Sequence, residues 1–96
     1  MARFDFIAAY LLANRKNGTL YAGSTTDLAA RMEAHKSGAG SVFTAKYACT
    51  RLVWYQRFDE MAPAIAMEKR LKRWPRKWKI DLIESVNPHW DDLRIW

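Results

Sequence analysis

Hydrophobic and polar residues follow short, distinct patterns along the chain, and glycine, proline and asparagine separate them. Residues 4–13 are apolar at nearly every position, which is typical of a central strand covered on both faces. Side chains alternate along a strand, so Tyr10 belongs to one face and Leu11 to the other. The Asn-Gly pair at Asn17 and Gly18 predicts a tight turn. Residues 19–23 are therefore expected to return as an antiparallel partner strand.

Capping residues and apolar periodicity predict helices in much of the remaining chain. Polar residues at 24–27 precede a helix that is expected to run to about Lys36. Residues 42–49 fit either a loop or a short helix. A long helix is expected from about residue 60 to Trp74, and Pro75 then begins a third helix that stops at Asn87. We expect Trp74 and the apolar stripe of the third helix to pack in the core; the stripe is Trp78, Leu82, Ile83 and Val86.

Residues 50–58 are rich in β-branched and aromatic side chains and predict a third strand. The order is then strand, strand, helix, strand, helix, helix. This order predicts the α+β class, with a small three-stranded antiparallel sheet flanked by helices. A chain of 96 residues has room for one hydrophobic core, so residues 1–96 are expected to form a single domain. The tail of residues 89–96 is expected to pack back on it.

The composition excludes several classes of protein. Cys49 is the only cysteine, so no intramolecular disulfide can form, and one cysteine with two histidines gives no zinc-binding pattern. We therefore expect a reducing compartment and predict a cytoplasmic protein. The apolar run of residues 6–13 is far too short to cross a bilayer, and no membrane partner is expected.

Positive charge is concentrated in one stretch of the chain. The formal net charge is +6, and residues 69–79 contain no acid. A local positive potential of this kind attracts polyanions, of which nucleic acid is the commonest. A solvated helix face and an acidic membrane surface are the alternatives. The predicted nucleic-acid-binding residues are the cations of this stretch: Lys69, Arg70, Lys72, Arg73, Arg76, Lys77 and Lys79.

Glu68 stands where an acid is not expected. On a helical wheel it falls within the apolar stripe that contains Ala64 and Leu71, so its carboxylate points toward the sheet. An ionised carboxylate in that position is costly unless it is paired or bound to a metal ion. An ion pair with Arg31 or Arg57 is the simpler explanation, and a metal site is the other.

Four polar residues in the first half of the chain have a spacing that allows them to meet. Tyr10 and Tyr21 lie on paired strands, and Arg31 and His35 follow one helical turn apart on the next helix. Taken singly, the tyrosines fit cross-strand aromatic contacts, Arg31 fits a surface cation and His35 fits a helix-end residue. Taken together, they indicate one site at an edge of the sheet.

These residues resemble the motifs of the GIY-YIG nuclease superfamily, and in particular its small stand-alone bacterial type. The first motif reads Ala8-Ala9-Tyr10 and the second reads Tyr21-Ala22-Gly23, so both tyrosines and the final glycine are present. Alanines replace the glycine and isoleucine of the first motif and the isoleucine of the second. Four further residues fall where the family's functional residues are expected: Arg31, His35, Glu68 and Asn87.

The resemblance implies a metal-dependent DNA endonuclease that acts in DNA repair, recombination or mobile-DNA processing. The implied catalytic residues are Tyr10, Tyr21, Arg31, His35, Glu68 and Asn87. Glu68 would hold one divalent cation, Mg²⁺ or alternatively Mn²⁺. Tyr10 is the expected general base, Tyr21 would orient the water or phosphate, Arg31 would bind phosphate, and His35 would accept or relay a proton. A free tyrosine ionises near pH 10, so forming its anion at pH 7 costs about 4 kcal/mol and needs nearby cations.

Two other classes of function fit the same residues. A nucleic-acid-binding module could keep the fold and the basic helix without catalysis. A structural partner in an assembly would use the aromatic tail and the basic face for protein contacts. RNA is an alternative substrate to DNA. We expect no second domain for recognition in a nuclease of this size, so a partner protein could supply specificity. The sequence leaves the identity of the general base and the oligomeric state open.

Overall fold

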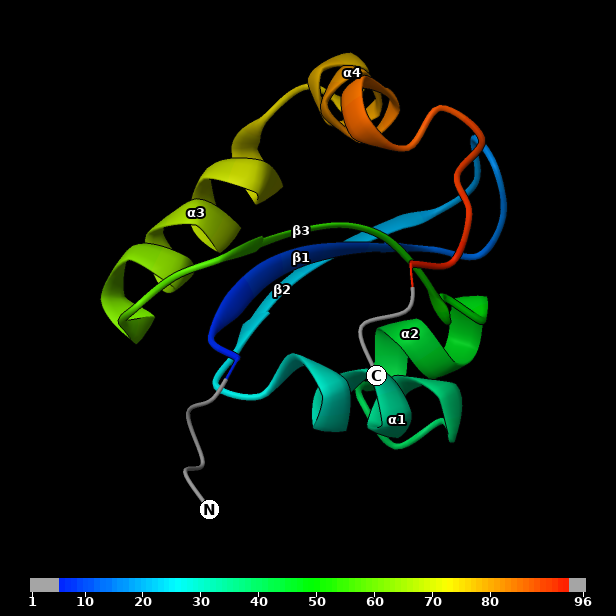
Figure 1. Cartoon of the computed structure of the whole chain (residues 1–96). Helices are drawn as coiled ribbons and strands as arrows, with labels where there is room; N and C mark the ends of the chain where they lie inside the picture. The colour runs from blue at the N-terminus through cyan, green and yellow to red at the C-terminus, as the bar shows by residue number, and fades with distance from the viewer. Residues whose placement is uncertain (1–5, 94–96) are drawn as a thin grey trace.

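The computed structural model describes residues 6–93, and a three-stranded antiparallel sheet lies at its centre in the order β2-β1-β3 (Figure 1). The central strand pairs with both neighbours, so that Tyr10 lies opposite Gly23 on one side and Tyr55 on the other. The strands are β1 (Ala8–Ala13), β2 (Leu20–Thr25) and β3 (Arg51–Arg57). The predicted α+β sheet is confirmed.

Helices cover both faces of the sheet (Figure 1). On one side lie α1 (Leu28–Lys36) and α2 (Val42–Tyr47), and on the other lie α3 (Met61–Arg73) and α4 (Arg76–Val86). The segment of residues 42–49, for which the sequence allowed either a loop or a short helix, contains the short helix α2. Within residues 6–93, no helix is long and apolar enough to cross a membrane.

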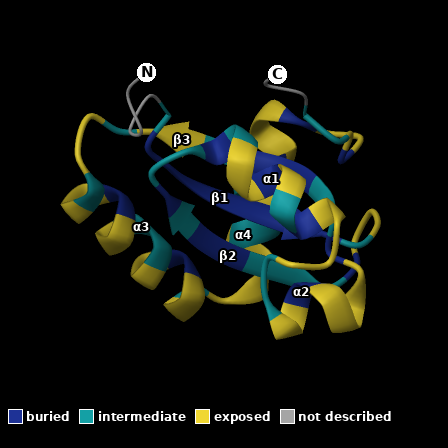
Figure 2. Ribbon diagram, turned by 90° about the horizontal axis from the view of Figure 1, so that it is seen from below, coloured by how far each residue is buried: buried dark blue, intermediate teal, exposed yellow. Residues whose placement is uncertain are grey.

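The alternation of side chains along β1 divides the core into two clusters. Leu11 faces α3 and α4 and packs in a cluster with Leu71 and Ile83. Tyr10 faces α1 and packs in a second cluster with Leu28. Figure 2 shows β1 buried along its whole length between these layers. The expectation of a central strand covered on both faces is therefore confirmed.

The expected start of the first strand is not confirmed. Regular pairing begins at Ala8, and Phe6 makes only an isolated parallel bridge to Asp27. The Phe6 carbonyl accepts a hydrogen bond from the Leu28 amide at the start of α1, whereas the Ile7 carbonyl accepts one from the Phe58 amide just after β3. Phe4 lies outside the described residues.

The expected apolar stripe of α4 is wrong at two positions. Ile83 is fully buried and Leu82 partly, but Trp78 is 55% exposed and Val86 is 66% exposed. The helix reaches the sheet mainly at β3, so only a narrow strip of its surface is covered. Trp74 packs partly against the core, as expected, and its ring meets that of Trp78 edge to face at 5.8 Å.

Candidate active site

Tyr10, His35 and Thr44 form a buried polar network between β1, α1 and α2. The Tyr10 hydroxyl lies 3.0 Å from His35 Nε2, and His35 Nδ1 lies 2.9 Å from Thr44 Oγ1. None of the three side chains has more than 1% of its surface exposed. Thr44 Oγ1 can donate to the Ser41 carbonyl, which lets it accept from Nδ1–H. In that arrangement, Nε2 carries the lone pair that accepts the Tyr10 proton.

Burial makes the neutral form of this network the stable one. It lowers the pKa of His35 to about 4, and the positive charge of Arg31 acts in the same direction. Burial also raises the pKa of Tyr10 well above its ordinary value, and the neighbouring Tyr21 adds to the shift. The charge of Arg31 only partly offsets that rise. At neutral pH, both the Tyr10 phenol and the His35 imidazole are therefore uncharged.

Two glycines leave the space that the network occupies. A β-carbon added to Gly23 would lie 2.5 Å from the hydroxyl and Cζ of Tyr10. A β-carbon added to Gly40 would lie 2.1 Å from His35 Nδ1. Gly23 is the final glycine of the second sequence motif. Because it has no side chain, the Tyr10 ring can lie close to the backbone of β2.

Glu68 points from α3 toward the sheet, as its place on the helical wheel predicted, and it meets the sheet at β2. The Ser24 hydroxyl donates a hydrogen bond to one carboxylate oxygen, and Lys72 Nζ lies 2.6 Å from the other. Burial opposes ionisation of Glu68, but the hydrogen bonds from Lys72 and Ser24 lower its pKa below the ordinary value. The expected ion pair with Arg31 or Arg57 is wrong, because the partner is Lys72, one turn further along the same helix.

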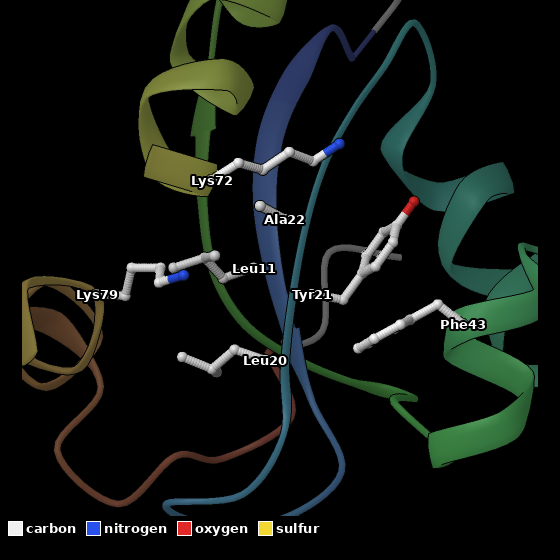
Figure 3. Close-up of a pocket in the computed structure, with 7 residues that line it drawn as sticks. All are labelled: Leu11, Leu20, Tyr21, Ala22, Phe43, Lys72 and Lys79. Carbon is white, nitrogen blue, oxygen red and sulfur yellow. The ribbon is translucent and has the colours of Figure 1, made fainter. Parts of the chain in front are cut away.

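Tyr21 lies half-buried at the mouth of a pocket of about 300 Å³ between β2, α2 and the two helices of the other face. Lys72 and Lys79 approach the pocket from one side and Tyr21 and Phe43 from the other, over a floor of apolar side chains that includes Leu20 (Figure 3). The Tyr21 ring lies 6.5 Å from that of Tyr10 and 5.6 Å from that of His35. The pocket therefore adjoins the buried network.

Arg31 is exposed on α1, yet its charge shifts the pKa of both Tyr10 and His35. The pKa of Tyr10 also responds to the charges of Tyr21 and Glu68. The structure thus brings five of the six predicted catalytic residues to one edge of the sheet, at β2. They are Tyr10, Tyr21, Arg31, His35 and Glu68.

Asn87 is the predicted catalytic residue that does not join this cluster. A β-bulge in β3 opposite Leu11 and Leu12 leaves Val53 unpaired, and the Asn87 side-chain amide donates to the Val53 carbonyl at 3.1 Å. The same amide donates to the Asp91 carbonyl and accepts from the Asp91 amide. Asn87 is thus fully engaged with backbone at the β3 edge and ties the C-terminal segment to the sheet.

The predicted nucleic-acid-binding residues lie in three kinds of surroundings: around the pocket, against the β1–β2 turn, and on the exposed surface of α3 and α4. Lys72 and Lys79 line the pocket, and Lys69 lies close enough to Glu68 to lower its pKa. Arg76 donates to the carbonyls of Asn17 and Gly18 in the β1–β2 turn, at 2.9 and 2.6 Å. The others are exposed on α3 and α4: Arg70, Arg73 and Lys77.

Three residues of the site were not predicted from the sequence patterns. Ser24 holds Glu68, Thr44 holds His35, and Phe43 lines the pocket with Tyr21. Ser24 stood in the predicted cap of α1, where the cap is in fact Asp27. Thr44 and Phe43 belong to α2, whose residues gave no clear periodicity. An apolar residue such as Phe43 within a segment of uncertain structure is a weak signal, and no spacing rule would have selected it.

No group of three or more metal-ligating side chains is gathered anywhere in the described part of the chain. A site that relies on one carboxylate is compatible with Mg²⁺, which keeps several waters and takes its remaining ligands from substrate phosphate oxygens. Glu68 fits this requirement because it is ionised, oriented by Ser24 and 21% exposed in its side chain.

Comparison with known proteins identifies the family. The family described as the GIY-YIG catalytic domain matches residues 6–81. The chain is 37% identical to a UPF0213 protein of Bacillus pumilus over 70 residues, which are 73% of this chain and 71% of that protein. It is 36% identical over 76 residues to the UPF0213 protein XAC3202 of Xanthomonas axonopodis pv. citri, covering 79% and 74% of the two chains.

A solved structure agrees with this assignment. The solution NMR structure of the UPF0213 protein BH0048 from Bacillus halodurans superposes with a TM-score of 0.52 at 31% sequence identity. The similarity covers 84% of this chain and 85% of that one. The resemblance seen in the sequence motifs is confirmed, and this chain belongs to the GIY-YIG family, a family of nuclease-type domains.

Proposed function

We propose that this protein is a metal-dependent DNA endonuclease that hydrolyses phosphodiester bonds at the β2 edge of its sheet. The observation that carries the proposal is the meeting there of an ionised carboxylate, a half-buried tyrosine and several cations. Phosphodiester hydrolysis needs an aligned water, a proton acceptor and positive charge against the phosphoryl oxygens. The cluster contains a residue suited to each of these tasks.

We place Tyr21 against the attacking water, where it would act as its phenolate. Its own proton would be lost to solvent beforehand, Lys72 and Lys79 of the same pocket would stabilise the anion, and the anion would accept the proton of the water. Tyr21 lines the open pocket, whereas Tyr10 has no exposed surface and a raised pKa. The role first expected of Tyr10 therefore passes to Tyr21. Tyr10 and His35 are proposed to position Tyr21, because their rings contact the Tyr21 ring.

Arg31 and Lys72 are proposed to bind the phosphate group. Arg31 is exposed and presents a planar fork of donors that matches two phosphate oxygens. Lys72 lies at the pocket, and its side chain is 54% exposed while its ammonium group pairs with Glu68. Because it is paired with a carboxylate at an exposed position, this ammonium group can move to a phosphate without crossing buried surface.

Glu68 is proposed to hold one divalent cation, Mg²⁺ or Mn²⁺. When bound, such an ion polarises the phosphate and stabilises the leaving oxygen. The hydrogen bond from Ser24 fixes one oxygen of the carboxylate, and the lowered pKa keeps the group ionised. Departure of Lys72 toward the phosphate would free the other oxygen for the ion.

DNA repair, recombination or mobile-DNA processing is the proposed setting, and it rests on the family resemblance. The predicted basic residues outside the pocket would add affinity for the phosphate backbone without choosing a sequence. They are Lys69, Arg70, Arg73, Lys77 and, where it is not held by the turn, Arg76.

The test is cleavage of labelled single-stranded, duplex, flapped and branched DNAs in the presence of Mg²⁺, Mn²⁺ or a chelator. Wild type should cut only with metal. Glu68→Gln should lose at least about a hundredfold in rate, the usual cost of removing a group that stabilises transition-state charge. Glu60→Gln is the matched control, because Glu60 lies at the start of the same helix, is exposed and makes no capping hydrogen bond.

Cleavage that survives in the chelator, or equal rates for Glu68→Gln and wild type, would contradict the proposed role of Glu68. One observation favours a second candidate, a binding module without catalysis: Lys72 already occupies the Glu68 carboxylate. Salt-sensitive binding of all four DNAs with no cutting in either metal would select that second function.

A further inference from the structure

A row of aromatic side chains extends from the proposed active site over α2. The Tyr21 ring lies 5.8 Å from the Phe43 ring at an interplanar angle of 30°, and the Phe43 ring lies 4.8 Å from that of Tyr47. We call these three residues the aromatic row. Its two members on α2 serve little in the core, because Phe43 and Tyr47 are each 41% exposed and belong to neither core cluster.

Cations border the aromatic row on both sides. Lys72 and Lys79 line the pocket opposite Tyr21 and Phe43 (Figure 3), and Lys46 lies 5.4 Å from the centre of the Tyr47 ring. Among residues 6–93, neither Lys79 nor Lys46 forms an ion pair with an acid. The surface thus offers flat apolar faces next to uncompensated positive charge. A nucleotide has the complementary chemistry, since its base is flat and its phosphate is negative.

The dimensions of the pocket agree with this ligand. Its volume of about 300 Å³ lies at the lower end of the range of about 300–1,000 Å³ for small-ligand sites. A base can reach an aromatic face only when its own faces are free. In a duplex, neighbouring base pairs cover both faces, so the site requires a nucleotide that is unpaired or drawn out of the stack.

We propose that the aromatic row and its pocket bind an unpaired nucleotide of the substrate, next to the phosphate that is cut. The base stacks on Phe43, and the row continues over Tyr47 for the following base. Lys79 binds the phosphate of the stacked nucleotide, while Lys72 serves the phosphate at the reaction centre. The position beside the cut phosphate rests on the proposed nuclease function, whereas the stacking site itself does not.

The experiment compares binding of a fluorescein-labelled oligothymidylate with binding of a strand of the same length made of abasic sugars. Both carry the same phosphates, so the difference in affinity measures the bases alone. Fluorescence anisotropy in chelator-containing buffer keeps the strands intact. Wild type should bind the strand with bases about tenfold or more tightly, given the strength of base–aromatic stacking.

Phe43→Ala should remove most of that difference, with little change in its affinity for the abasic strand. Phe43→Trp should keep the difference, because it retains an aromatic face. Trp78→Ala is the matched control, because Trp78 is an exposed aromatic outside the pocket and its loss should leave the ratio unchanged. Circular dichroism of each variant checks that it is folded.

Equal affinity of wild type for the two strands, or an unchanged ratio in folded Phe43→Ala, would overturn the proposal. An equal loss in Phe43→Ala and Trp78→Ala would also overturn it. The outcome is separate from that of the cleavage test. Metal-dependent cutting without base-dependent binding contradicts only the stacking site, and base-dependent binding without cutting contradicts only the nuclease.

Discussion

Tyr10 and Tyr21 lie on adjacent strands with their ring centres 6.5 Å apart, yet they occupy opposite environments. Tyr10 is sealed in a neutral network with His35 beneath the sheet edge. Tyr21 stands at the mouth of a pocket with lysines on its other side. The same residue type therefore takes two roles: the buried half of the site fixes positions, and the open half meets the substrate and carries charge.

The largest expected effect comes from disturbing both halves at once with Gly23→Ala. The new methyl group would lie 2.5 Å from the Tyr10 hydroxyl, so the ring must move and the network must open. We expect a loss of about 1–3 kcal/mol in the free energy of unfolding, as for other overpacked cores. Cleavage should fall as well. Urea denaturation and the cleavage rate measure the two effects, and a variant that matches wild type in both would contradict the described packing.

Tyr10→Phe tests the buried half alone. It removes the hydroxyl that lies 3.0 Å from His35 Nε2 and leaves that nitrogen without its partner. An unsatisfied buried polar group costs about 1–3 kcal/mol of stability. Tyr55→Phe is the control, since Tyr55 is a half-buried tyrosine opposite Tyr10 on β3 and packs by its ring against Phe6. Equal urea midpoints for the two variants would show that the Tyr10–His35 bond does not stabilise the fold.

The pH dependence of the free energy of unfolding tests the buried half of the site through His35. Burial keeps the pKa of folded His35 at about 4, below the ordinary value of 6.5, so the unfolded chain binds a proton that the folded chain excludes. The contribution of His35 is therefore complete above pH 6.5 and declines as the pH falls toward 4. Urea midpoints of wild type and His35→Gln at pH 7 and pH 5 should converge at the lower pH. A constant gap would contradict the neutral, buried imidazole.

The smallest expected effect concerns charge in the open half. Lys79→Met should lower the slope of log affinity against log salt for DNA by about 0.7–0.9, the value for one phosphate contact. Lys77→Met should change the slope less, because Lys77 lies on the same helix but does not line the pocket, and it pairs with Asp81. Equal slopes for the two variants would mean that α4 binds phosphate with no preference for the pocket side.

Local patterns were sufficient for the parts of the fold that depend on neighbours in sequence. The apolar run of β1 indicated a strand covered on both faces, and the wheel position of Glu68 predicted a carboxylate directed toward the sheet, where it meets Ser24. The place of Asn87 away from the cluster could not be predicted, because it depends on a bulge that frees the Val53 carbonyl, and bulges leave no clear mark in sequence. Trp78 was misplaced because periodicity shows which face of a helix is apolar, but not how much of that face a partner covers.

In the site, the sequence patterns also could not predict how deeply a side chain is buried or which residue it pairs with. Both tyrosines were found, but nothing in their spacing distinguished the buried Tyr10 from the accessible Tyr21. Arg31 and Arg57 were plausible partners for Glu68, and the structure shows that Lys72 on its own helix takes that place. Contacts between elements decide these points, so they follow from the fold and not from the pattern of any one element.

The most direct test of the division between the two halves is the single-turnover cleavage rate of Tyr21→Phe, with its stability measured alongside. The account predicts a rate lower by about a hundredfold or more, as for loss of a general acid or base, with a urea midpoint equal to that of wild type. Tyr10→Phe should instead lower the urea midpoint clearly and reduce the cleavage rate less than Tyr21→Phe does. A folded Tyr21→Phe protein that cuts DNA at the wild-type rate would contradict the account.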